Sequence, residues 1–165
     1  ENAPVPWKWS SRSKVLAIGQ FPNIAEETKG TPFTGKSYTK MWEIMKAEAG
    51  LTPGKVFMAH AFACRPPTGR LSREITDACT CPNLWLPKLF TACTPNVVLA
   101  FGNAGVAAFT GKGIGIMKLN ATSIWHAKYR AMVVFSITPG MMAYDESGEK
   151  EEMFREAIRK LKEYL

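Results

Sequence analysis

Short apolar runs alternate with amphipathic segments along the chain. The four clearest runs are almost free of polar residues and are typical of buried strands: KVLAIG (14–19), KVFMAHAFAC (55–64), NVVLAFG (96–102) and AMVVFSI (131–137). Strands that are apolar without alternation are typical of a parallel sheet covered on both faces. The pattern therefore predicts an α/β fold, a three-layer α/β/α sandwich around a central four-stranded parallel sheet.

Between the strands, apolar residues recur at helical spacing. The first such segment, 37–50, ends at Gly50, which supplies a C-terminal stop. A second helix is expected to begin with Ser72 as its N-cap, and Pro82 breaks or restarts it. A short helix is expected at 103–109, after the third strand. The chain closes on an amphipathic helix whose apolar face is expected to carry Met153, Phe154, Ala157, Ile158, Leu161 and Leu165.

Length and charge narrow the class of protein. A chain of 165 residues is expected to form one domain, which we place at 14–165 behind an extended arm, 1–13, that carries two tryptophans. The net charge of +7 and the pI of about 9.3 suit a polyanionic partner such as DNA. No apolar run approaches the roughly 18 residues that span a bilayer, so we expect no membrane partner and an intracellular location.

The segments with unusual composition stand where the predicted strands end. GQFPNIAEETKGTPFTG (19–35) holds three glycines, two prolines and two adjacent carboxylates, and long ordered loops after strands tend to hold ligands. The other three segments are HAFACRPPTGR (60–70), GNAG (102–105) and TPGMM (138–142). Because ligands of parallel sheets bind at the carboxyl ends of the strands, the four segments are expected to form one site.

The order of these segments resembles the uracil-DNA glycosylase superfamily, and most closely its family-4 type, the enzymes with an iron–sulfur cluster. The family's first motif, GEAPGxxE(D/E)xxGxPFxG, is similar to 19–35 without a gap. Its second motif, NxxKCRPPxNR, is similar to 60–70, and PKxIVxLGxxA is similar to 95–105. The usual HPS motif appears as TPG at 138–140, and the resemblance covers roughly 14–165.

The resemblance implies a pocket for a base that is flipped out of the DNA stack, since the glycosidic bond cannot be reached inside a duplex. Phe33 would stack on the flipped ring, and the glycines would let the backbone approach it closely. The base-binding residues implied are Gly19, Phe21, Phe33 and His60. The DNA contacts expected are Lys36, Arg65, Arg70, Pro139, Gly140 and Met141. The Met141-Met142 pair would act as a wedge in the base stack.

The chain departs from the family at three positions that carry chemistry. The resemblance implies an acid that handles water, an Asn that reads the base and a His that donates to the base oxygen; here these are Gln20, His60 and Thr138. Gln20 cannot act as a general base, and Thr138 cannot carry the positive charge that strengthens a hydrogen bond to an anion. We therefore assign catalytic roles to Gln20, Glu26, His60 and Thr138, with His60 as the charged donor and Glu26 keeping it charged and orienting water.

The four cysteines indicate whether the chain could hold an iron–sulfur cluster. Family-4 proteins hold a four-iron cluster through four thiolates, two of them from an N-terminal CxxC-like pair, and this sequence contains no CxxC pair. Cys64 matches the third ligand, Cys81 or nearly as well Cys79 matches the fourth, and Cys93 takes a position that is usually apolar. We expect no cluster and no other cofactor. The alternative is a rearranged set of Cys64, Cys79, Cys81 and Cys93.

These observations favour a DNA glycosylase-like protein that recognises or excises an altered pyrimidine. The alternative is a catalytically inactive relative that binds DNA or serves as a structural subunit. A flavodoxin-like nucleotide-binding domain fits less well, because the stretch from Gly19 to Glu27 lacks a phosphate-cradling glycine pattern and its paired acids would repel phosphate.

Overall fold

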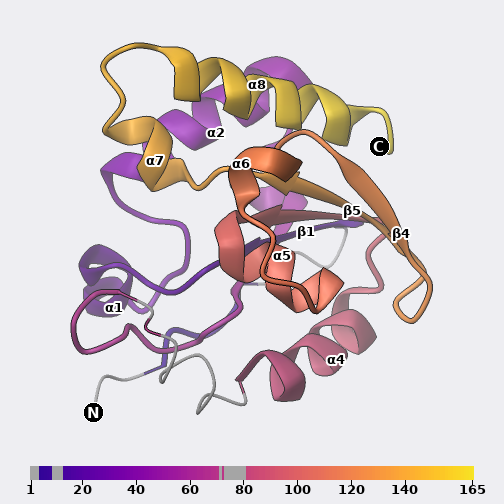
Figure 1. The fold of residues 1–165 in the computed structure, drawn as a ribbon. Helices are drawn as coiled ribbons and strands as arrows, with labels where there is room; N and C mark the ends of the chain where they lie inside the picture. Colours follow the sequence, from indigo (N-terminus) through magenta and orange to yellow (C-terminus); the bar gives the residue numbers. More distant parts are fainter. Residues whose placement is uncertain (1–3, 9–12, 71, 73–80) are drawn as a thin grey trace.

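The computed structural model describes residues 4–8, 13–70, 72 and 81–165, and these residues form three layers (Figure 1). The middle layer is a five-stranded sheet in the order β2-β1-β3-β5-β4. Its strands are β1 (Val15–Gly19), β2 (Val56–His60), β3 (Val97–Phe101), β4 (Ser123–His126) and β5 (Ala131–Ser136). The α/β fold and the four parallel strands predicted from the apolar runs are confirmed.

The fifth strand corrects the expected count of four. β4 pairs antiparallel with β5 at the edge of the sheet, with Ser123 opposite Val134 and His126 opposite Ala131. Its residues are only partly buried, and Trp125 is 59% exposed. An edge strand that faces solvent needs no continuous apolar run, so a search for such runs passes over it.

Helices cover both faces of the sheet. On one face α2 packs against α7 and α8, and on the other α5 lies against β1, β3 and β5, with α4 beside it (Figure 1). No helix among the described residues has the length and apolar character to cross a membrane. The helices are α1 (Ile24–Lys29), α2 (Lys36–Ala49), η1 (Pro53–Lys55), α4 (Cys81–Cys93), α5 (Gly102–Thr110), α6 (Ile116–Leu119), α7 (Pro139–Ala143) and α8 (Glu149–Lys162).

The helices predicted from periodicity are found, with one local error. The apolar face of α8 is buried through Phe154, Ala157, Ile158 and Leu161. Leu165 lies beyond the end of α8 and is 54% exposed, so its assignment to that face was wrong. α4 begins at Cys81, next to the predicted restart at Pro82. The helix expected to begin at Ser72 falls on 73–80, outside the described residues.

Part of the N-terminal arm pairs with the edge of the sheet. The Lys8 N–H donates to the Met58 carbonyl at 2.8 Å, and the Met58 N–H donates to the Lys8 carbonyl at 2.9 Å. The Val5 N–H donates to the Ala63 carbonyl at 2.8 Å. These bonds supply partners for backbone groups of β2, which otherwise forms an open edge.

Charged side chains join α2 to α8. Glu48 on α2 accepts hydrogen bonds from Arg155 at 2.9 Å and from Arg159 at 3.2 Å, both on α8. The hydrogen bond from Arg155, and then that from Arg159, lowers the pKa of Glu48 below its ordinary value of 4.5. A carboxyl whose pKa is lower in the folded state stabilises that state at neutral pH, and this contribution is lost as pH falls through the folded pKa.

We therefore expect Glu48→Gln to lower the free energy of unfolding at pH 7. The difference from the wild-type protein should shrink as pH falls below 4.5, because Glu48 then becomes protonated and neutral in both states. Urea denaturation at pH 7 and at pH values below 4.5 measures it. Glu43→Gln, an exposed change on the same helix, is the control. A difference that does not depend on pH would contradict the prediction.

Candidate functional site

The candidate site lies where four parallel strands end at one edge of the sheet. α1 and α7 lie at this edge, on the left of Figure 1. Gly19 at the end of β1 is in register with His60 at the end of β2. Gly102 directly follows β3, and Thr138 stands two residues beyond β5. The fold thus brings together the four segments that the sequence placed at strand ends.

A short helix, α1, replaces part of the long loop expected at 19–35. Asn23 is its N-cap, and the Glu26 N–H donates to Asn23 Oδ1 at 2.9 Å. The Asn23 N–H donates back to Glu26 Oε2 at 2.7 Å, which completes a capping box. Asn and Glu at this spacing are a known helix-start signal, so the sequence contained the information that the loop interpretation missed.

Glu26 and His60 form a buried pair. His60 Nε2 lies 2.8 Å from Glu26 Oε1, and the two side chains are 1% and 0% exposed. The Phe33 N–H donates to the same Oε1 at 2.5 Å, and the Asn23 N–H donates to Oε2. Three donors therefore surround the Glu26 carboxylate, which offsets the cost of removing it from water. An ionised carboxylate only accepts, so His60 Nε2 carries the proton in this contact.

The other side of the His60 ring fits into a space left by Gly19. A Cβ on Gly19 would overlap His60 Nδ1 and come within 2.6 Å of Cε1. The Phe33 ring stands edge-on to His60, with ring centroids 5.3 Å apart. Among the described residues, His60 Nδ1 has no hydrogen-bond partner although it is buried. The ring is thus held in one position while one of its nitrogens stays available.

Phe33 is fixed by strong local constraints. It has a φ of 58°, unusual for a residue other than glycine, and is 3% exposed. Tyr38 stacks on one face of its ring at 5.0 Å, with 9° between the planes. Burial, and then the charge of Glu26, raises the pKa of Tyr38, which stays neutral. The sequence placed Tyr38 on the apolar face of its helix, and nothing in that pattern indicated its contact with Phe33.

Gln20 and Thr138 meet above Gly102. A Cβ on Gly102 would overlap Gln20 Nε2 and come within 2.7 Å of Thr138 Cγ2. Gly102 also has a φ of 66°, which favours glycine. Thr138 is the N-cap of α7, and its Oγ1 accepts from the Met141 N–H at 3.2 Å.

A family model of the Uracil DNA glycosylase superfamily matches residues 7–162. The chain belongs to this superfamily. It is similar to the type-4 uracil-DNA glycosylase of Thermotoga maritima, at 24% identity over 93% of this chain and 78% of that protein. It is also similar to the type-4 enzyme of Sulfurisphaera tokodaii, at 24% identity over 96% of this chain and 73% of that protein. The type-4 enzyme of Pyrobaculum aerophilum is 32% identical over 46% of this chain and 38% of that protein.

The DNA contacts expected for a member of this superfamily differ in accessibility. Lys36 and Arg70 are exposed, and Arg65 is half-buried. In the 138–142 segment, Met141 is 36% exposed and Gly140 is half-buried, whereas Pro139 is buried and cannot present its ring to DNA. Met142 is 2% exposed and belongs to the core, so the expected two-residue wedge was wrong for Met142. Phe21 is partly buried and packs against the core.

The described cysteines give a limited test of the cluster that family-4 members of the superfamily carry. Cys64 is exposed and Cys93 is buried. Burial raises the pKa of Cys93 to about 11, which favours the neutral thiol, whereas a cluster ligand is a thiolate. Within the described residues no group of three or more His, Cys, Asp or Glu side chains could hold a metal ion. Cys93 therefore does not fit a ligand role; Cys79 and the side chain of Cys81 lie outside the described part.

We expect the purified protein to show no visible iron–sulfur absorbance and no stoichiometric iron. The physical reason within the described residues is the buried thiol of Cys93, whose raised pKa favours the neutral form over a cluster-binding thiolate. An absorbance spectrum and an iron assay on protein purified without oxygen measure it, with a family-4 enzyme prepared in parallel as the positive control. Close to four irons per chain would contradict the expectation and point to Cys79 and Cys81 as replacement ligands.

Proposed function

We propose that this member of the superfamily binds DNA at the carboxyl edge of its sheet and cleaves the N-glycosidic bond of a flipped, altered pyrimidine. The observation that carries the proposal is the buried Glu26–His60 pair. His60 takes the motif position that resembles the family's base-reading Asn. A side chain fixed in one orientation by a buried partner can stabilise charge that develops next to it without having to reorganise. Phe33 beside them is 3% exposed and covered by Tyr38, so in this conformation it holds the His60 ring in place.

The reaction separates charge in a defined way. The bond from the sugar carbon to the base nitrogen breaks, and the base leaves with the electron pair. Water then adds to the positively charged sugar carbon and loses a proton to solvent, and the departed base takes up a proton. Negative charge therefore develops on the base, and a fixed donor aimed at it is often the largest single catalytic contribution. Because His60 Nε2 donates to Glu26, Nδ1 is the remaining nitrogen, and it can donate to the base only in the doubly protonated, cationic form of the ring.

Glu26 is better placed to position His60 than to activate water. It is 0% exposed, and both of its oxygens already accept hydrogen bonds. Gln20 is half-buried and lies against Thr138, so its amide is the group placed to hold the attacking water. An amide orients water without removing its proton, which suits a reaction in which the sugar becomes positively charged before water adds.

A second candidate is an inactive relative that binds DNA. The observation that favours it is the use of Thr138 Oγ1 as the N-cap acceptor of α7, at the position where the family has a donating His. Gln20 likewise takes the place of the acid. The two changes replace the family's charged donor and its acid with neutral side chains.

Incubation with a panel of duplexes and single strands that carry different modified pyrimidines separates the two candidates. Abasic sites are scored by alkaline cleavage, and unmodified DNA is the control. Abasic sites in one modified substrate, at a rate proportional to protein, support the enzyme. Binding of the same DNA without any base release supports the inactive relative and rejects the proposed reaction.

We also expect DNA binding to depend steeply on salt. Three phosphate contacts, from Lys36, Arg65 and Arg70, would lower the affinity about fortyfold between about 50 and 200 mM salt, because each contact releases condensed counterions. Lys36→Ala should reduce the slope of log affinity against log salt by about 0.9. Fluorescence anisotropy with a labelled duplex measures it. Lys162→Ala is the control, since Lys162 ends α8 on the far side of the molecule (Figure 1). Equal slopes for wild type and Lys36→Ala would exclude Lys36 from the interface.

A further inference from the structure

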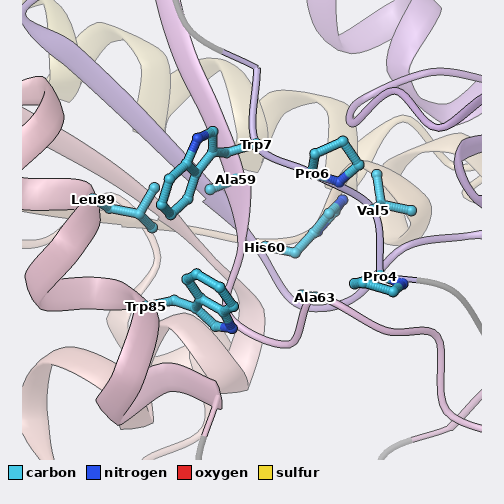
Figure 2. Close-up of a pocket in the computed structure, with 9 residues that line it drawn as sticks. All are labelled: Pro4, Val5, Pro6, Trp7, Ala59, His60, Ala63, Trp85 and Leu89. Atoms are coloured by element: carbon cyan, nitrogen blue, oxygen red, sulfur yellow. The ribbon is translucent and has the colours of Figure 1, made fainter.

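A cavity lies beside the end of β2. It is lined by the N-terminal arm, the end of β2 and α4, is open to solvent on one side, and has a volume of about 270 Å³ (Figure 2). The residues that define its walls include Pro4, Pro6, Trp7, Ala63, Trp85 and Leu89. Of these residues Ala63 lies in the 60–70 motif, and the other five fall outside the quoted motifs and the proposed reaction.

The walls of this cavity, which we call the Trp pocket, suit a flat aromatic ring. Trp7 and Trp85 meet edge to face, with ring centroids 5.5 Å apart and 89° between the planes. Two indole rings at right angles offer one face for stacking and one edge for lateral contact. The proline rings of the arm lie across the cavity from α4 (Figure 2). Trp7 is 37% exposed, so solvent reaches this aromatic surface.

Positive charge stands beside the aromatic walls. Lys88 Nζ lies 5.0 Å from the centre of the Trp85 ring, and Lys88 is exposed on α4. Lys8, also exposed, follows Trp7 in the arm. Stacking surfaces combined with cations are how proteins bind nucleotides of a single strand, because the rings take the bases and the cations take the phosphates. A purely apolar ligand would gain nothing from the two lysines.

The Trp pocket also touches the candidate active site. His60 lines it, and the same residue contacts Glu26 and Phe33 in the active site. Its buried Nδ1 has no partner among the described residues. The two sites thus share a residue at the end of β2.

We infer that the Trp pocket binds a nucleobase, with Trp85 and Trp7 contacting the ring and Lys88 contacting a phosphate. The base belongs either to a single-stranded stretch of DNA or to a free nucleotide. This inference goes beyond the proposed function, because it concerns a pocket outside the flipped-base site and requires no chemistry.

Binding of two probes, the oligonucleotide (dT)8 and the mononucleotide dTMP, tests this by isothermal titration at low salt. Trp85→Ala removes the stacking surface, and Ala63→Leu fills the pocket without removing a wall. Both variants should weaken binding ten- to a hundredfold, the range for loss of one stacked base. Trp125→Ala is the matched control, since Trp125 is 59% exposed on β4, at the other edge of the sheet. The affinity of this variant for each probe should stay within twofold of the wild-type value.

Each result decides the inference. Binding of dTMP that is lost in both pocket variants assigns the pocket to free nucleotides, and binding of (dT)8 alone assigns it to a strand. Wild-type affinity in Trp85→Ala and Ala63→Leu, or no binding of either probe to the wild type, overturns the inference. If neither the wild type nor any variant releases a base, but (dT)8 binding still requires Trp85, the proposed reaction is rejected and the inference about the Trp pocket stands.

Discussion

Replacing His60 with alanine is expected to slow base release about a hundredfold, the usual effect of losing one donor to a developing anion. Thr138 cannot supply a charged donor, and His60 Nδ1, beside Phe33, is buried without a partner among the described residues. The effect should appear in the rate of the chemical step under single-turnover conditions and leave DNA affinity nearly unchanged. Gel analysis of abasic sites at saturating protein measures it.

The same substitution leaves the Glu26 carboxylate buried without its partner. Two backbone donors to Glu26 remain, but losing one donor to a buried acceptor costs about 1–3 kcal/mol, so folding has to be checked by thermal denaturation. His60→Asn restores the family's reading residue and serves as the second variant, since an amide can still donate to Glu26. A folded His60→Ala protein that releases base at the wild-type rate would remove His60 from the mechanism and leave the enzyme in place.

Replacing Gly102 with alanine is expected to abolish most activity and to destabilise the protein by about 1–3 kcal/mol. The new Cβ would overlap Gln20 Nε2 and press on Thr138 Cγ2, so both side chains would be displaced at the edge of the sheet. A displacement of about 1 Å in a catalytic group costs about a hundredfold in rate. Single-turnover rates and urea denaturation measure the two effects.

Gly111→Ala is the matched control for Gly102→Ala. Gly111 has a φ of 65°, nearly the same as that of Gly102, but no described atom lies within 4 Å of the position that its Cβ would take. It follows the same helix, α5, at its other end. The control should therefore show the backbone strain without the overlap, and keep its activity. Equal losses of activity in both variants would mean that strain, and not the contact with Gln20 and Thr138, explains the effect.

Much of the architecture was determined by local pattern. The four parallel strands follow from apolar runs, because a strand buried on both faces is apolar at every position. The helices α2 and α8 follow from helical spacing, because a helix buried on one face repeats its apolar residues every three or four positions. The same pattern located the edge of the sheet at which the motifs meet. It passed over β4, whose partly exposed residues carry no such run.

The sequence also indicated which residues form the site, but not which of their side chains contact one another. The sequence singled out Glu26, His60 and Phe33, and it expected Glu26 to act on His60. It could not show that Glu26 has both oxygens occupied, that Phe33 is covered by Tyr38, or that Met142 is buried in the core. These facts depend on which side chains meet after residues distant in the chain are folded together.

The Trp pocket is the clearest example of a feature that only the folded structure determines. Trp7 and Trp85 lie far apart in the chain, and nothing local to either predicts that their rings meet. Strand and helix periods depend on neighbours within a few residues, so they can be recognised in the unfolded chain. The spaces left by Gly19 and Gly102, and the cavity between the arm and α4, exist only after folding, because they arise where elements far apart in the chain pack against one another.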